Sequence, residues 1–263
     1  MYRFVRESLK SAGSSALLIL KFVIPLHILA DILLYTGALQ PLTFLFAPVT
    51  RLLDLPAEAA MALVSGMLLN IYAGIAFAAP LGLTAYQWTV LAVFLGVCHS
   101  MIVECAIMAK LGISYSYSII LRGAGACITV LPVLWMPASF FETGQQTRTL
   151  TLPQHDSFLQ MLVHSAGGAL VLSCKIIVLI SVIIVIMDAV KASRWVQQRL
   201  AKVSTSFSII VGQLLGITYG AGILIREAGR GILSREDIFF ISTFLMICHS
   251  IVEDVLLFVL FGA

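Results

Sequence analysis

Two stretches of the chain repeat the residues best suited to chemistry. Each holds Cys-His-Ser inside a long apolar run, as Cys98-His99-Ser100 in the first copy and Cys248-His249-Ser250 in the second. An acid follows each histidine after five residues, Glu104 in one copy and Asp254 in the other. Polar groups are costly inside apolar membrane segments and usually mark function there. The doubled set therefore predicts a working site where two related halves of a membrane protein meet.

Helical geometry decides which of these side chains can act together. Ser100 and Glu104 are four residues apart and share a helix face, as do His249 and Glu253. His99 and Glu104, in contrast, lie about 140° apart on a regular helix. They can bind one ligand together only if the helix is broken between them.

These residue types favour two kinds of bound species and leave one purely structural alternative. Imidazole, carboxylate and thiolate groups are ligands for Fe, Mn, Ni or Zn, which would make a divalent metal the transported substrate. That ligand set is His99, Glu104, His249, Asp254, Cys98 and Cys248. The same groups can instead hydrogen-bond a polar organic solute or relay protons. As the structural alternative, they only lock the two halves together, and burial as small apolar residues explains the two cysteines.

Further polar residues lie elsewhere in the apolar segments. Asn70 and Gln213 occupy glycine-rich segments, where an amide can contact a substrate or satisfy broken backbone. The full solute-binding set is His99, Ser100, Glu104, His249, Ser250, Glu253, Asp254, Asn70 and Gln213. His27 and Asp31 are four residues apart and predict a proton-linked or a structural pair. With Lys175, which lies about ten residues inside its apolar run, they are the candidates for ion coupling.

Composition places the chain in a membrane. Of its 263 residues, 60% are hydrophobic and 11% are charged, and the mean hydropathy is +1.04. Soluble domains carry roughly a quarter charged residues. The net charge of +3 does not indicate nucleic acid, because the charges lie in short links between apolar segments. All five cysteines fall in apolar segments, which argues against a disulfide framework.

The apolar segments fall into three classes. Ranges long enough to span a bilayer are 16–38, 86–111, 115–137, 165–189 and 237–261. The first of them continues too far to be a cleaved signal peptide, so we expect it to be retained. Ranges 41–55 and 191–203 are amphipathic and predict interfacial helices. Ranges 58–80 and 205–225 are apolar but interrupted by glycine and polar residues.

The order of these segments repeats along the chain. Ser11-Ala-Gly13 matches Ser165-Ala-Gly167 at an offset of 154, and the Cys-His-Ser copies match at an offset of 150. We therefore expect repeat one over 4–112, a connecting helix and polar loop over 113–157, and repeat two over 158–262.

The placement of lysine and arginine indicates how the interrupted segments sit. If both cross the membrane, the two sides carry seven and seven basic residues. If both dip in and return, twelve lie inside with the N-terminus, Arg122 among them, and two lie outside. Cytoplasmic loops are enriched in lysine and arginine, so the re-entrant arrangement is favoured. It makes the two repeats inverted, with turns near 70–74 and 216–220.

This architecture resembles the nucleoside-recognition or "Gate" domain family of membrane proteins. The resemblance rests on the two Leu-x-x-Cys-His-Ser stretches with an acid five residues on, and on the glycine-broken segments before them. That family is related to concentrative nucleoside transporters and to the gate regions of ferrous-iron transporters. The resemblance implies a nucleoside-like solute, although 58–80 offers only Ser65, Asn70 and Tyr72 as polar contacts.

The sequence thus predicts an all-α integral membrane protein with two inverted repeats, two re-entrant helical hairpins and about six transmembrane helices, five of which are located by the ranges above. We expect a secondary transporter of a small polar solute, in a bacterial or archaeal inner membrane, with a cytoplasmic N-terminus and as a homodimer. The chain has no Walker A loop, Gly-x-Ser-x-Gly elbow or His-Glu-x-x-His sequence. Nothing in it therefore supports ATP-driven transport by this chain alone. Ser100 and Ser250 are the only hydroxyl nucleophiles beside the two repeated histidines, and inverted symmetry favours alternating access over a one-sided active site, so we expect that the protein is not an enzyme. The sequence leaves the cofactor undetermined, apart from a divalent metal as a substrate. Divalent metal transport and a non-transporting assembly role are the alternatives.

Overall fold

The computed structural model describes residues 2–38, 40–141, 157–193, 233–249 and 253–261, with single residues at 225, 229, 231 and 263. The described residues are helical and include no strand. The helices are α1 (Tyr2–Thr36), α2 (Gln40–Leu52), η1 (Ala57–Ala59), α3 (Ala60–Leu68), α4 (Ile71–Ala78), η2 (Ala79–Leu81), α5 (Ala85–Cys98), α6 (Met101–Ala109), α7 (Tyr115–Leu134), η3 (Ala138–Phe140), α8 (Phe158–Ala192), α12 (Arg235–Cys248) and α13 (Glu253–Val259).

Four helical stretches among the described residues are long and apolar enough to cross a membrane. They are Ala12–Thr36, Ala85–Ala109, Tyr115–Leu134 and Phe158–Val190. Each matches a range expected from the sequence, and α12 with α13 follows the fifth range, 237–261. The prediction of an all-α integral membrane protein is confirmed to this extent. The lipid bilayer is therefore its surrounding medium, since apolar side chains cover the outer faces of these helices.

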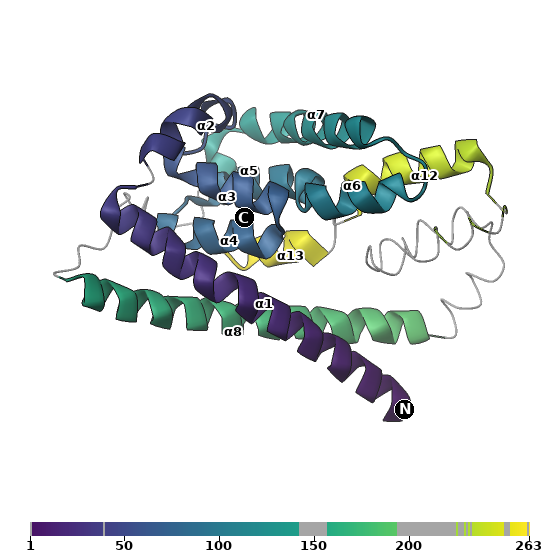
Figure 1. Cartoon of the computed structure of the whole chain (residues 1–263), viewed down its shortest axis with the longest axis horizontal. Helices are drawn as coiled ribbons and strands as arrows, with labels where there is room; N and C mark the ends of the chain where they lie inside the picture. The colour runs from purple at the N-terminus through teal and green to yellow at the C-terminus, as the bar shows by residue number, and fades with distance from the viewer. Residues whose placement is uncertain are drawn as a thin grey trace.

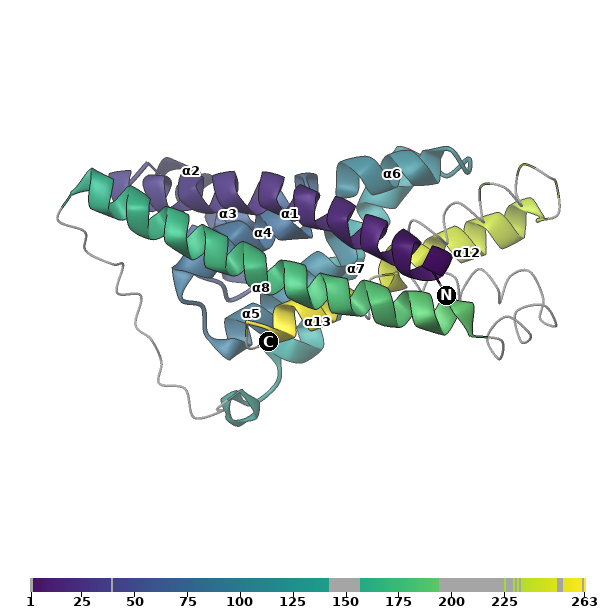
Figure 2. The same cartoon turned by 90° about the horizontal axis from the view of Figure 1, so that it is seen from below.

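Three layers of helices are stacked in the view of Figure 1: α7 above, α3 to α6 in the middle, and α1 with α8 below. α1 and α8 are both 35 residues long, and they cross and pack against each other. α1 runs from right to left in Figure 1, whereas α8 runs from left to right, and Figure 2 shows the same opposition. Buried aliphatic side chains, among them Ile19, Val23 and Ile176, belong to the core here.

The interrupted segment at 58–80 forms a helical hairpin of α3 and α4. Asn70 has an extended backbone, with φ −170° and ψ 168°, and its Oδ1 accepts a hydrogen bond from the Ala73 amide at 3.0 Å. The turn thus lies at the start of the expected stretch, 70–74. A Cβ on Gly74 would lie 3.1 Å from the Ala62 oxygen and 3.2 Å from Gly66 Cα, so this glycine permits the two arms to pack closely. The second hairpin, 205–225, lies outside the described residues except for residue 225.

The helices that carry the two motifs match in length and in capping. α5 and α12 each have 14 residues, beginning after Thr84 and Ser234, which are 150 residues apart. Both N-cap side chains accept a hydrogen bond from the amide of the third helical residue, Gln87 or Asp237, and that residue's side chain bonds back to the cap. α5 and α6 run from left to right in Figure 1, and α12 and α13 run from right to left. Local sequence thus produces the same capped helix in both motif regions.

Candidate functional site

A break between α5 and α6 gives the first motif its geometry. His99 is extended, with φ −69° and ψ 163°, and Ser100 is left-handed, with φ 49°. A left-handed backbone is uncommon outside glycine. The Ser100 amide donates to the Gly66 oxygen at 3.1 Å, which ties the break to α3. The break brings His99 Nε2 to 3.1 Å from Glu104 Oε1, which an unbroken helix would prevent.

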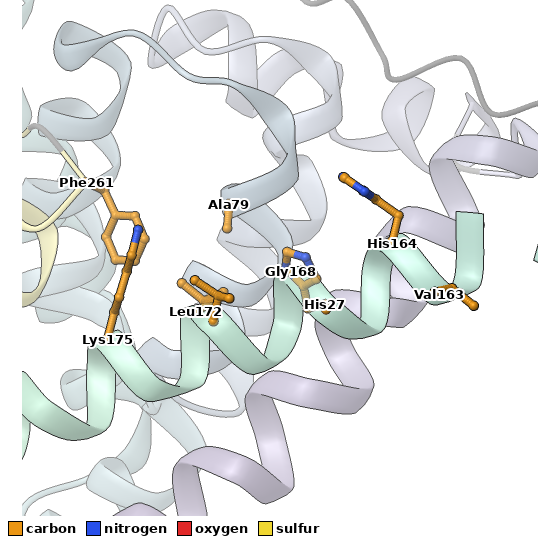
Figure 3. A pocket seen from close by; sticks show the side chains of 10 residues that line it. His27, Ala79, Val163, His164, Gly168, Leu172, Lys175 and Phe261 are labelled. Carbon is orange, nitrogen blue, oxygen red and sulfur yellow. The ribbon is translucent and has the colours of Figure 1, made fainter. Parts of the chain in front are cut away.

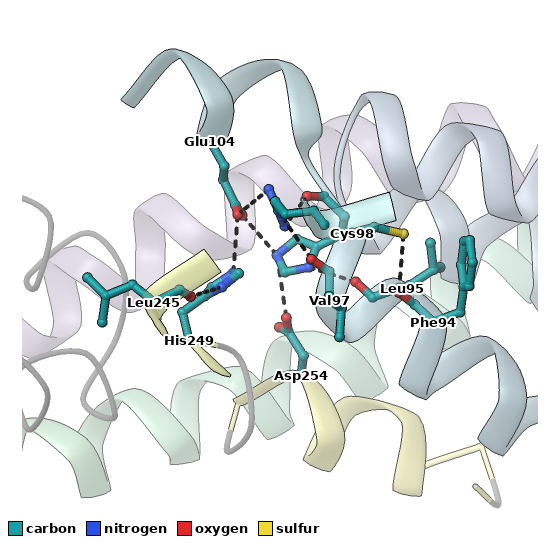
Figure 4. Close-up of polar contacts among 10 residues, drawn as sticks. Phe94, Leu95, Val97, Cys98, Glu104, Leu245, His249 and Asp254 are labelled. Carbon is teal, nitrogen blue, oxygen red and sulfur yellow. Dashed lines mark hydrogen bonds and ion pairs between the residues drawn. The ribbon is translucent and has the colours of Figure 1, made fainter. Parts of the chain in front are cut away.

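The second motif enters the same site from α12 and α13. α12 ends at Cys248, α13 begins at Glu253, and the His249 ring centroid lies 5.1 Å from that of His99. His249 Nε2 is 3.3 Å from Glu104 Oε2, and His99 Nε2 is 3.5 Å from Asp254 Oδ2 (Figure 4). Each histidine therefore reaches the acid of the other copy, and the two copies meet as expected.

Both imidazole rings are oriented by the helix that ends at them. His99 Nδ1 lies 2.9 Å from the Leu95 oxygen, and His249 Nδ1 lies 3.0 Å from the Leu245 oxygen. A carbonyl oxygen only accepts hydrogen bonds, so we assign the proton to Nδ1 in both rings. In a neutral ring, Nε2 then presents a lone pair toward carboxylate oxygens. A proton or another cation must therefore lie between Nε2 and the carboxylate to avoid repulsion between their lone pairs. Histidines that bind a metal also commonly donate their other ring N–H to a backbone carbonyl.

Arg122 of α7 completes the cluster and is fully buried. Its Nη1 lies 2.7 Å from Glu104 Oε2, while Nε and Nη2 donate to the oxygens of Val97 and His99, both at 2.8 Å. It thus neutralises Glu104 and also caps the last carbonyl groups of α5. The count of basic residues treated Arg122 as a cytoplasmic topology charge, which is wrong, because it lies inside an apolar helix. The position of Arg122 within a predicted spanning range could have indicated a buried ion pair, since charged residues within spans usually have a partner.

The His99 cluster, defined as His99, Glu104, Arg122, His249 and Asp254, has a simple charge balance. Its members are at most 8% exposed. Two carboxylates and one guanidinium leave one negative charge if both imidazoles are neutral. One added proton balances it, whereas a divalent ion would leave one positive charge. Unbalanced charge is costly at this depth of burial, so one monovalent positive charge fits best.

Metal ligation is nevertheless geometrically accessible to part of the predicted set. Ligand atoms of His99, Glu104 and His249 all lie within 4.8 Å of one another. Cys98 is directed elsewhere, because its thiol donates to the Phe94 oxygen at 3.2 Å. Neither Cys98 nor Cys248 belongs to the group of close ligand atoms found among the described residues. The thiolate part of the predicted metal set therefore does not assemble in this structure.

The remaining predicted residues have separate places. Asn70 caps α4, as the backbone-satisfying alternative predicted. Ser100 contributes its backbone to the break. Gln213 and Ser250 lie outside the described residues, and so does the side chain of Glu253, the first residue of α13.

The predicted ion-coupling residues form a second polar group between α1 and α8. His27 Nε2 lies 3.6 Å from Asp31 Oδ2, one helical turn along α1. Lys175 lines the same cavity as His27. The ion pairs among the described residues do not connect this group with the His99 cluster.

The chain is similar to a bacterial membrane protein. It is 33% identical over 258 residues to YvoD of Bacillus subtilis (strain 168), described as an uncharacterized membrane protein, with 92% of this chain and 81% of YvoD covered. No family model matches the chain, and no solved structure matches it.

Proposed function

The chain belongs to the membrane-protein family of Bacillus subtilis YvoD, and from that premise we propose that it is a secondary-transporter-like protein. It binds a small polar solute where two inverted repeats meet. The observation that carries the proposal is the crossed pairing of the two motifs, His99 with Asp254 and His249 with Glu104. Alternating access requires related halves that share one site, and paired broken helices supply such a site.

Inverted repeats are supported by matched helices that run in opposite directions. α5 and α12 have the same length and equivalent caps, and α1 and α8 have the same length. α1 and α8 run in opposite directions in both views (Figures 1 and 2), and α5 and α12 do so in Figure 1. Equivalent helices that run in opposite directions are expected when the second repeat has the inverted membrane topology.

A re-entrant hairpin is supported by the lengths of its arms. Ala57–Leu68 and Ile71–Leu81 are short apolar helices. At about 1.5 Å per residue, each arm reaches roughly 18 Å, less than the roughly 30 Å core of a bilayer. The hairpin therefore enters and returns on one side, and the repeat extends this arrangement to 205–225.

The N-terminus is cytoplasmic in this proposal, in a bacterial or archaeal inner membrane. Without Arg122, the basic residues divide eleven (12 − 1) inside against two outside, which keeps the same orientation. Single cysteines at Ala85 and Arg235, which are 150 residues apart at the starts of α5 and α12, test this in a background without the native cysteines. Impermeant labels should reach residue 85 from outside and residue 235 from inside. Labelling of both from inside would sink the inverted arrangement.

The solute class follows from the resemblance to nucleoside-recognition proteins, which favours a nucleoside-like solute. A thermal-unfolding panel on the purified full chain tests it, comparing nucleosides with Fe²⁺, Mn²⁺, Zn²⁺ and Ni²⁺. A ligand of the folded state raises the unfolding temperature with concentration. Stabilisation by a nucleoside, lost in His99→Gln/His249→Gln and kept in Cys105→Ala, supports the proposal.

Divalent metal transport is the second candidate, favoured by the three ligand atoms within 4.8 Å of one another. Stabilisation by one metal, lost in the same double variant, would replace the solute proposal. The contact of Arg122 with Glu104 opposes it, because a guanidinium beside a ligand carboxylate repels a dication. If neither ligand class shifts unfolding, the cluster is a structural clamp in a non-transporting assembly protein.

A further inference from the structure

A cavity of about 530 Å³ lies between α1 and α8, away from the contacts of the His99 cluster. Helix η2 and Phe261 close other sides of it, and Figure 3 shows its lining side chains. Small-molecule sites typically have volumes of about 300–1,000 Å³. We call this cavity the α1–α8 pocket. Its size allows a ligand of about ten to twenty heavy atoms, on the order expected for a small organic molecule.

The pocket lies near the middle of two apolar spans. Lys175 is 17 residues from the start and 15 from the end of the span Phe158–Val190. His27 lies inside the span Ala12–Thr36. Lipid head groups lie at the two surfaces of a bilayer, roughly 15 Å from its centre. A charged group at the depth of Lys175 must therefore face protein, a water-filled cavity or a bound solute.

The polar part of the lining is basic. His27, His164 and Lys175 line the pocket, and the lining contains no acid. His27 contacts Asp31, which lies outside the lining. The ion pairs among the described residues do not include Lys175. The pocket thus carries a cation whose charge the described side chains leave without an ion-pair partner.

A buried imidazole, His27, also lines the pocket. His27 is 7% exposed, and although it approaches the Ala76 backbone, its Nδ1 makes no well-formed hydrogen bond with a described residue. Gly168 allows α8 to pack closely against this ring, since a Cβ there would lie 3.3 Å from His27 Nε2. The other walls are largely apolar and include Leu172 and Phe261.

We propose that the α1–α8 pocket binds a small organic anion with an apolar body. The carboxylate or phosphate group pairs with Lys175, and the apolar body packs against Leu172 and Phe261. Mid-membrane depth favours a dissolved solute over a lipid head group. This site is distinct from the His99 cluster and does not depend on which ligand that cluster binds.

Binding to the purified full chain in non-ionic detergent tests the site, with benzoate and phenyl phosphate as probes and neutral benzamide as the size-matched control. We expect saturable stabilisation by the two anions and none by benzamide. Lys175→Gln should weaken anion affinity about tenfold or more, the scale of one hydrogen bond to a charged group. Equal shifts with benzamide, no saturable shift, or an unchanged affinity in Lys175→Gln would each overturn the proposal.

Two further variants separate loss of the site from loss of folding. Gly167→Leu adds volume at a lining position where a Cβ meets nothing within 4 Å, and should abolish binding, with the unfolding temperature without ligand as the check that the variant folds. Lys21 lies 154 residues before Lys175, the same offset as the repeated Ser-Ala-Gly, and it does not line the pocket. Lys21→Gln should therefore bind as the wild type does. In nanodiscs, phosphatidylglycerol in place of phosphatidylcholine should leave benzoate affinity unchanged. Competition by phosphatidylglycerol that requires Lys175 would instead identify a lipid site.

Discussion

The His99 cluster and the α1–α8 pocket both contain a basic side chain and two imidazoles at membrane depth, but only the cluster also contains carboxylates. In the cluster, Arg122 pairs with Glu104, each carboxylate lies within 3.5 Å of an imidazole nitrogen, and the exposed fraction ranges from 0% at Arg122 to 8% at Asp254. In the pocket, Lys175 lines open space without an acid in the lining. Polar residues in apolar helices can therefore either pair with one another or line a cavity that is open to a ligand. The apolar sequence around them looks alike in the two cases.

Arg122 should have the largest effect on folding. Arg122→Leu leaves Glu104 without its guanidinium and two α5 carbonyls without a donor, which should cost about 3–5 kcal/mol of unfolding free energy. Unfolding in mixed detergent micelles measures this. The matched change in the pocket, Lys175→Gln, should alter stability by less than about 0.5 kcal/mol, as for other sites without a lost partner. Equal losses would erase the distinction between the two regions.

The α3–α4 hairpin should tolerate less added side-chain volume than a helix face that has no close neighbouring atoms. Gly74→Ala places a Cβ against the backbone of Ala62 and Gly66, which should cost about 1–3 kcal/mol. Gly123→Ala is the control, because its Cβ meets nothing within 4 Å, and helix propensity favours alanine. Thermal unfolding of both variants checks the prediction. A destabilised Gly123→Ala with an unaffected Gly74→Ala would show that the close packing is not limiting.

Crossed pairing of the motifs predicts coupled variants. His249→Gln and Glu104→Gln should be non-additive, with a coupling energy of about 1 kcal/mol, because His249 Nε2 and Glu104 Oε2 are in contact. A double-mutant cycle on unfolding free energy measures it. The same cycle between His249 and Lys175 should give no coupling, since no ion pair joins them. Additivity within the cluster would mean that the two copies do not depend on each other.

The break at Ser100 should give the smallest effect. Ser100→Gly suits the φ of 49° and should change stability by about 1 kcal/mol or less, in the stabilising direction. Any ligand response of the His99 cluster should persist, because the Ser100 contact with Gly66 uses the backbone amide. Thermal unfolding with and without ligand measures both effects. Loss of the ligand response would instead assign the hydroxyl to the site.

Composition and the doubled motif predicted much of the fold. Apolar length identified the four spans, and glycine with Asn70 located the first hairpin, since an asparagine cap and close helix packing are local requirements. The convergence of His99 and Glu104 depended on a helix break, and the structure has that break. The repeat boundaries and the second hairpin remain predictions.

Only the tertiary structure decided which partners these residues have. Arg122 bonds to the oxygen of Val97, which is 25 residues away, and Cys98 bonds to its own helix instead of joining the ligand group. Likewise, His27 and Lys175 line one pocket although 148 residues separate them. Apolar length and local capping fix whether a segment is a membrane helix. Which charges meet depends on how those helices cross, and hydropathy carries no information about that crossing.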